Sequence, residues 1–210
     1  MIRLGSSSAI NRHPVSLMDR SNPSVPMPAL SANLKRAVVE MPEKEKDKLL
    51  MRLITKDPIL TERLEYELVE EKSTLDYRRQ LIRDLTDRTA KLDPDTAGWL
   101  MMDMRTVSGY ITRHVKVTKD SYGEVDLTLH MLNAFLDNHL GLLKTLNGRT
   151  EKCAQYVAKR TDMLLKKLNK LDPDYFMEFE KGMNRLLQHV HIGALAHFAK
   201  MLTLPKSWQI

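Results

Sequence analysis

The chain has 210 residues, of which 42% are hydrophobic and 29% charged, enough for a folded core in one or two domains. With 8 glycines, 9 prolines and 33 basic against 27 acidic residues, it fits neither a collagen-like nor an intrinsically disordered class. No uncharged apolar run approaches the 18 residues that suggest a membrane span. The single cysteine, Cys153, permits no intrachain disulfide, and we expect a cytoplasmic protein.

Residues 1–28 differ in composition from the rest of the chain. They are rich in Ser and Pro, are basic and contain no apolar period, which predicts a disordered tail. Met27 stands directly before the segment that begins the folded part, so 1–28 is either a flexible tail or an over-extended reading frame. An organellar transit peptide is the alternative, because Asp19 is the only acidic residue of the segment. The expected organisation is this tail, a short-helix hairpin region at 29–92 and a long-helix bundle at 93–210.

Apolar residues recur with helical spacing from Leu30 onward, which predicts an all-α fold of about eight helices. Four short helices are expected before residue 93, and one of them begins with Asp57 as N-cap and Pro58 in the first helical position. Asp93 and Pro94 are expected to open a fifth helix in the same way. Its apolar stripe keeps the helical period for about 19 residues.

Residues 114–129 allow two interpretations. Two short runs alternate apolar and polar residues, and Lys119–Gly123 between them fits the turn of a β-hairpin. The second run also belongs to an apolar helical stripe that starts at Val125. The favoured interpretation is therefore a loop at 116–123, followed by a long helix to about Leu146.

Two further helices are expected, one at about 149–170 and one that begins at Asp172 and runs to about residue 202. The last is apolar nearly all round, so we expect an antiparallel bundle around this C-terminal helix. A short HEAT-like α-solenoid is the alternative, because an Asp-Pro helix start recurs at Asp57, Asp93 and Asp172. Common capping chemistry explains the same recurrence.

The motifs of several enzyme classes are missing from the sequence. It contains no glycine-rich phosphate loop and no G-x-S-x-G elbow, so neither nucleotide-driven nor serine-hydrolase chemistry is supported. Six histidines crowd the second half, but the Glu-x-x-His and His-x₃-His spacings of helical metal sites are absent. We expect neither a metal nor a cofactor, and a histidine-centred metalloenzyme is only the third hypothesis.

The positive charge is concentrated in residues 1–36, which carry five Lys or Arg and one Asp, and in residues 116–170, which carry ten Lys or Arg and six Asp or Glu. Cations near the ambiguous segment, together with the outer face of the seventh helix, form a candidate surface for phosphates or for a protein partner. The candidate binding residues are Arg113, His114, Lys116, Lys119, Arg149, Lys152, Lys159, Arg160 and Lys167.

Three stretches carry a resemblance: GYITRHVKVTKDSYGEVDL at 109–127, MPEKEKDKLL at 41–50 and KDPIL at 56–60. Together they resemble an uncharacterised family of small helical bacterial proteins. The resemblance covers about residues 30–145 and implies a helical fold and a cytoplasmic setting. It brings no activity, ligand or catalytic residue.

The leading functional hypothesis is a non-catalytic helical module that binds a protein partner through its surface, as an adaptor. The alternative is an RNA- or ribosome-associated factor that uses the basic surface. The two differ in salt dependence, because contacts to phosphates release counterions and weaken steeply as salt is added.

Overall fold

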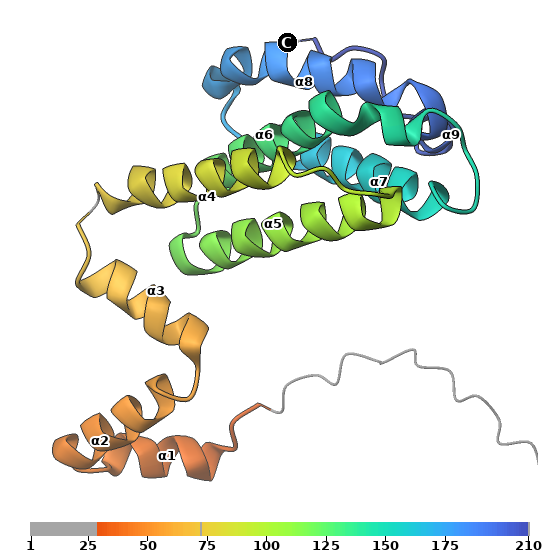
Figure 1. Cartoon of the computed structure of the whole chain (residues 1–210). Coiled ribbons are helices and arrows are strands. Elements are labelled where there is room, and N and C mark those ends of the chain that lie inside the picture. The colour runs from red at the N-terminus through yellow and green to blue at the C-terminus, as the bar shows by residue number, and fades with distance from the viewer. Residues whose placement is uncertain (1–28, 72, 210) are drawn as a thin grey trace, which may run out of the picture. The chain divides into compact units, whose positions relative to one another are not determined.

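The computed structural model describes residues 29–71 and 73–209, so the tail predicted at 1–28 lies outside the described residues (Figure 1). Within these ranges every regular element is a helix: nine are α-helices and two are short 3₁₀ helices. This confirms the all-α prediction. None of these helices combines the length and the apolar composition that crossing a membrane requires.

The described part of the chain divides into two units, with the boundary between Lys48 and Leu49. The described part of the first unit contains α1 (Ala32–Glu40) and the beginning of α2 (Glu43–Ile54). Ser31 caps α1 by accepting a hydrogen bond from the Leu34 amide, and Lys46 Nζ donates to the Val39 carbonyl. Neither α1 nor α2 contains a buried residue.

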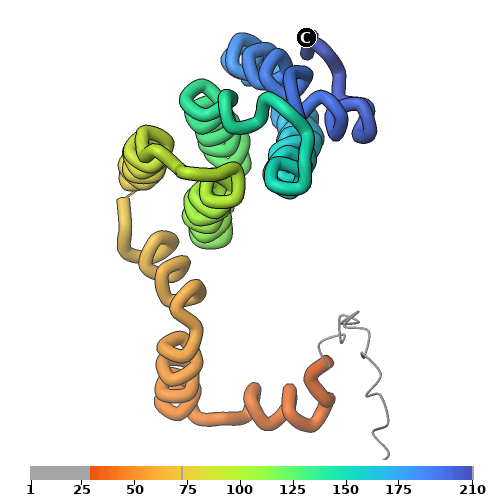
Figure 2. Tube along the Cα trace, turned by 45° about the vertical axis from the view of Figure 1, so that its right-hand side comes forward, coloured from red at the N-terminus to blue at the C-terminus, as the bar shows by residue number. Residues whose placement is uncertain are grey.

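The second unit is built around one central helix. Its α6 packs against α4, α5, α7 and α8, whereas the C-terminal α9 packs against α7 and α8, so the central helix is not the C-terminal one that we expected. α4 and α7 lie on opposite sides of the α5–α6 pair (Figure 2). The elements are α3 (Pro58–Leu68), α4 (Thr74–Ala90), α5 (Ala97–Thr118), α6 (Ser121–His139), η1 (Leu140–Leu143), α7 (Glu151–Leu168), η2 (Pro173–Tyr175), α8 (Phe176–Val190) and α9 (Gly193–Met201).

The apolar stripes of the sequence form the core. On α5 the predicted stripe is buried, with Leu100 and Met104 fully inside, and α6 is buried on nearly all sides, with Phe135 among its fully buried side chains. Removing this much apolar surface from water is the main force that holds helices together. α4, which the sequence analysis places in the 29–92 region, packs on α5 and α6 as part of the same core.

The connection between α5 and α6 is much tighter than predicted. Neither the loop at 116–123 nor the β-hairpin is formed, because α5 runs on to Thr118 and α6 begins at Ser121. Lys119 takes the left-handed conformation, with φ of 59°, and ends α5. Asp120 then caps α6. A left-handed residue at the end of a helix is usually Gly or Asn, so a lysine at this position could not be recognised from the sequence as the end of α5.

Two other helix ends differ from the expectation. α5 begins at Ala97 and is capped by Thr96, whose hydroxyl accepts from the Trp99 amide, rather than by Asp93. The expected C-terminal helix is broken into α8 and α9 at Gly193, where φ is +58° and a Cβ would lie 2.4 Å from the Leu143 carbonyl oxygen. This close approach requires glycine, and the break adds one helix to the expected eight.

Candidate functional site

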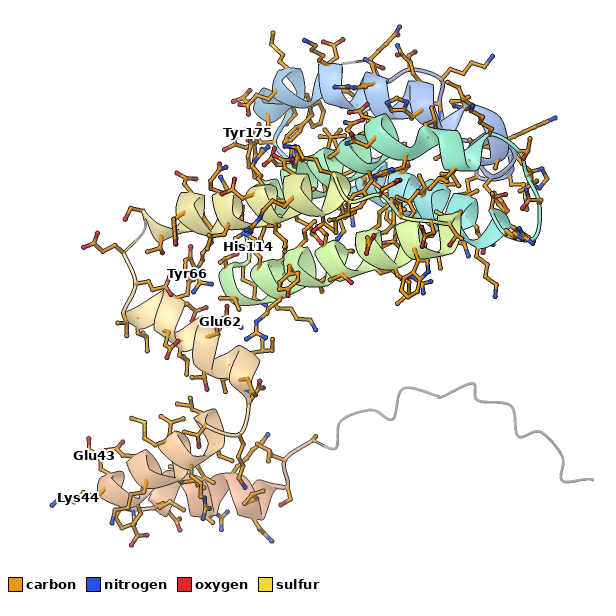
Figure 3. All side chains as sticks on the ribbon, viewed as in Figure 1. Glu43, Lys44, Glu62, Tyr66, His114 and Tyr175 are labelled. Atoms are coloured by element: carbon orange, nitrogen blue, oxygen red, sulfur yellow. The ribbon has the colours of Figure 1, made fainter. Side chains whose placement is uncertain are left out.

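The turn between α5 and α6 is held by a buried carboxylate, that of Asp120, whose side chain is 5% exposed. It accepts hydrogen bonds from Nε and Nη2 of Arg79 on α4, at 2.7 and 2.8 Å, and from the Gly123 amide at 2.8 Å. His114 Nε2 lies 3.1 Å from the same carboxylate. Figure 3 shows His114 where α4 and α5 face each other, so one carboxylate joins α4, α5 and the first turn of α6.

The charges of this corner compensate one another. Burial alone would raise the pKa of Asp120, but the hydrogen bonds from His114, Arg79 and Gly123 outweigh it and hold the pKa well below its ordinary value. The same ion pair raises the pKa of Arg79. Arg79 also lies over the ring of Tyr122, with its guanidinium carbon 5.0 Å from the ring centre. Because each charge has its partner inside the chain, we assign the corner a structural role.

A polar groove of about 610 Å³ lies between α4, α6 and α8. Its carboxylates and cations are joined across helices, so the groove has few free charges to offer a ligand. The Tyr122 hydroxyl at its end donates to Glu178 at 2.6 Å, and burial together with this bond raises the pKa of Tyr122 to about 12. The cross-helix contacts of the groove are the ion pairs Arg83–Asp126 and Asp137–Arg185 and the hydrogen bonds Asp87–His130 and Asp137–His189.

The histidines and the cysteine form no shared centre. Among the described residues, no three His, Cys, Asp or Glu side chains lie where they could hold a metal ion together. His139 and His191 each bind a backbone carbonyl, of Ala90 and Pro205, instead of one another. Cys153 is 1% exposed and burial raises the pKa of its thiol to about 12, so the nucleophilic thiolate is disfavoured at neutral pH.

The outer side of α7 carries a row of cations. Lys152, Tyr156, Lys159 and Met163 are spaced by four, three and four residues and therefore lie on one face of the helix. Lys166 and Lys167 continue this face in the next turn, and Arg149 precedes the row just before the helix begins. The opposite side of α7, which includes Cys153, Val157 and Leu164, is buried. One carboxylate of α7 pairs with the row, because Asp162 accepts from Lys166 at 2.6 Å.

A second row, on α5, lies beside the first. Arg105, Gly109, Thr112 and Lys116 follow one another at helical spacing on α5. The two rows adjoin, because the Arg105 guanidinium lies over Tyr156 of α7, and because Thr112 and residues of α7 line the same small hollow. We name this surface the α5–α7 basic face; it comprises Arg105, Gly109, Thr112 and Lys116 of α5 and Lys152, Tyr156, Lys159, Arg160, Met163 and Lys167 of α7.

The centre of the basic face is a tyrosine between two arginines. The guanidinium carbons of Arg105 and Arg160 lie 5.5 and 5.9 Å from the ring centre of Tyr156. Neither arginine forms an ion pair with a residue that the structure describes. Arg160 is half-buried, and its Nε and the Tyr156 hydroxyl are buried without a hydrogen-bond partner among the described residues. This is where the chain leaves cationic hydrogen-bonding capacity unused.

The structure brings most of the predicted site residues together, but not all. Lys116, Lys152, Lys159 and Arg160 lie on the basic face, and Lys167 lies there as well, in an ion pair with Glu124 of α6. Arg149 and Lys119 are exposed at its margins, just before α7 and at the α5–α6 corner. The remaining two lie elsewhere: Arg113 donates to Glu62 of α3 at 2.7 Å, and His114 is buried in the Asp120 cluster.

Sequence reasoning missed Arg105 and Tyr156, although Tyr156 stands between Lys152 and Lys159 at helical spacing. That spacing was the available signal, whereas Arg105 joins them only through the packing of α5 on α7. No protein-family model, no curated protein and no solved structure matches the chain. A functional assignment therefore depends on the geometry of its own residues.

Proposed function

We propose that this chain is a non-catalytic helical binding protein that holds the phosphate backbone of a nucleic acid, RNA foremost, on the α5–α7 basic face. The observation that carries the proposal is the half-buried Arg160, which has no carboxylate partner among the described residues. A guanidinium taken partly out of water without a counter-ion is costly unless an anion from outside compensates it. Its planar donors match phosphate oxygens.

The dimensions of the face suit a backbone ligand. Lys152 and Lys167 are fifteen residues apart on one helix, a length of about 22 Å, which is comparable with the axial rise of about six base pairs of a duplex. Exposed lysines at both ends supply further contacts. Carboxylates neutralise part of this end of α7 in two ion pairs, Lys167–Glu124 and Lys166–Asp162.

The same geometry argues for binding with little sequence preference. Reading single-stranded RNA by sequence relies on exposed aromatic rings that stack on bases. The ring of Tyr156 already has two guanidiniums beside it, so it is poorly placed to stack on a base. We therefore expect contacts to phosphates, which position a ligand but do not read its sequence.

The test is fluorescence anisotropy of the full chain with a labelled 20-nucleotide RNA and with the DNA of the same sequence, at several salt concentrations. We expect the logarithm of the association constant to fall linearly with the logarithm of the salt concentration, because phosphates that bind the protein release counterions. The double variant Lys152→Glu/Lys159→Glu changes two exposed residues of the face, and we expect it to bind at least about tenfold more weakly.

The matched control is Lys181→Glu/Lys206→Glu, which makes the same change of net charge at two exposed lysines outside the basic face. We expect it to bind within about twofold of the unaltered chain, since a local contact and not the total charge is at stake. Equal losses in both double variants would contradict the proposal, and so would binding that does not respond to salt.

A further inference from the structure

A second surface lies on the other side of α5, between this helix and α4. It is a groove of about 500 Å³ with an apolar floor formed by Leu81, Ile82 and Leu85 of α4. Tyr110 of α5 forms one wall. We name it the α4–α5 groove; it shares no residue with the α5–α7 basic face, and the inference drawn from it does not rest on the proposed function.

Large apolar side chains stand unpartnered along this groove. Leu81 and Tyr110 are 48% and 51% exposed, although each occupies a helix whose other side is part of the core. Trp99, about three turns before Tyr110 on α5, is also exposed, but the polar Asp103 and Thr106 lie between the two at helical spacing, so the apolar surface of the groove is that of its own lining. Clusters of exposed apolar residues with polar rims are typical of protein-binding surfaces.

The rim of the groove is positive. Three arginines line it, Arg78, Arg88 and Arg113, and the only carboxylate among the lining residues is that of Glu62. Glu62 is shared, since Arg78 Nη1 donates to it at 3.1 Å and Arg113 Nε at 2.7 Å. Figure 3 shows Glu62 on α3, which carries this carboxylate to one end of the groove.

The arginines differ in how fully the chain compensates them. Arg78 also pairs with Glu70, so its charge is largely satisfied within the chain. Arg88, at the far end, forms no ion pair with a described residue and donates only to the backbone carbonyl of Asp84. Arg113 uses its Nε for Glu62 and is about half exposed. An incoming segment with carboxylates at its two ends would meet Arg88 and Arg113.

We infer that the α4–α5 groove binds an amphipathic helix of a protein partner whose apolar row is flanked by acidic residues. Arg113 lies at the same end of the groove as Arg78, because both donate to Glu62, and Arg78 lies ten residues before Arg88 on α4. The two ends are therefore about 15 Å apart, or three turns of a bound helix. Such a helix places residues i, i+3, i+4 and i+7 on the apolar floor. Its acidic flanks face the arginines, and this electrostatic match favours it over a basic helix of the same apolar pattern.

The inference is tested with a synthetic 16-residue helical peptide that has leucines at i, i+3, i+4 and i+7 and glutamates at both ends. Two further peptides serve as comparison, one with lysines in place of the glutamates and one with the same composition in scrambled order. Titration calorimetry with the full chain is expected to show the acidic peptide binding at least tenfold more tightly than either of the others.

Three variants connect this binding to the groove. Leu81→Glu is expected to lower the affinity for the acidic peptide at least fivefold. Met177→Glu, at a 78% exposed position of α8, is expected to leave that affinity unchanged. Arg88→Glu is expected to lower the affinity for the acidic peptide and to raise the affinity for the lysine peptide. Because Leu81 and Arg88 are exposed, these variants keep the fold, which circular dichroism verifies.

Three results would overturn the inference. The first is an acidic peptide that binds no better than its scrambled form, and the second is one that binds Leu81→Glu as well as it binds the unaltered chain. The third is self-association of the chain in sedimentation experiments that Leu81→Glu abolishes, since the occupant of the groove would then be a second copy.

Discussion

Two arginines of this molecule sit in opposite electrostatic situations. Arg79, at the α5–α6 corner, meets the buried carboxylate of Asp120 through two hydrogen bonds. Arg160, on the α5–α7 basic face, is also half-buried but has no carboxylate partner among the described residues. The first uses its charge to join helices, and the second leaves its charge available. The comparison teaches that the uncompensated cation, more than the overall charge, marks the candidate binding site.

The largest effect is expected from Asp120→Ala. The substitution removes the N-cap of α6 and leaves Arg79 and His114 buried without their partner, so we expect the free energy of unfolding to fall by about 3–5 kcal/mol. Urea denaturation at pH 7 measures this change. Asp162→Ala is the control, because its pair with the exposed Lys166 is worth less than about 1 kcal/mol. Similar losses in both variants would show that the corner is an ordinary surface contact.

The contribution of Asp120 to the free energy of unfolding is expected to disappear gradually as the pH is lowered. The pKa of Asp120 is lower in the folded chain than in the unfolded chain, so the carboxylate stabilises the fold above its unfolded pKa of about 3.9. As the pH falls below that value, the unfolded chain takes up the proton first and the stabilisation is lost. We therefore expect Asp120→Asn to have a lower urea midpoint than the unaltered chain at pH 7, and this difference in midpoint to be smaller at pH 3. A gap that does not narrow in acid would contradict the assignment.

The comparison itself is tested by making one substitution at both arginines. Arg160→Met keeps the apolar stem and roughly the volume but removes an uncompensated charge, so we expect the free energy of unfolding to stay unchanged or to rise, while RNA affinity falls about fivefold or more. Arg79→Met should do the reverse, losing about 3 kcal/mol because the buried Asp120 loses the arginine that compensates its charge, and keeping its RNA affinity. If Arg160→Met lost as much stability as Arg79→Met, Arg160 would be a structural residue.

Much of this fold was predictable from local patterns. The start of α3 at Asp57–Pro58 and the buried stripe of α5 follow from capping chemistry and helical spacing, which act over a few residues. The α5–α6 corner was not predictable in the same way. The turn depends on Lys119, which takes the left-handed conformation, and on Arg79, which binds Asp120 although the two are 41 residues apart in the sequence.

The candidate site was predictable in part. The cations of α7 share a helix face by spacing alone, and that portion of the surface is where the sequence placed it. His114 was expected on the surface, yet it lies three residues after the buried Ile111 and continues the same row. Its burial was therefore readable from the periodicity. The association of Arg105 with Tyr156 was not, because it arises only when α5 packs on α7.

The smallest expected effect concerns Gly109, in the middle of α5. A Cβ at this position meets nothing within 4 Å, so Gly109→Ala should raise the free energy of unfolding by about 0.5–1 kcal/mol through helix propensity alone. Gly109 also stands in the α5 row between Arg105 and Thr112, where a bound backbone would pass. Gly109→Leu should therefore weaken RNA binding in the anisotropy assay although it does not weaken the fold.

Gly141→Leu is the control for Gly109→Leu. A Cβ at position 141 also meets nothing within 4 Å, but this glycine lies in η1, outside the basic face. It should leave RNA affinity unchanged. A loss of affinity at position 109 and not at 141, with both folds intact, would place the ligand across the α5 row itself, because an added leucine changes shape there without changing any charge. Equal affinities would place the ligand on α7 alone, and Arg105 would then serve only to pack against Tyr156.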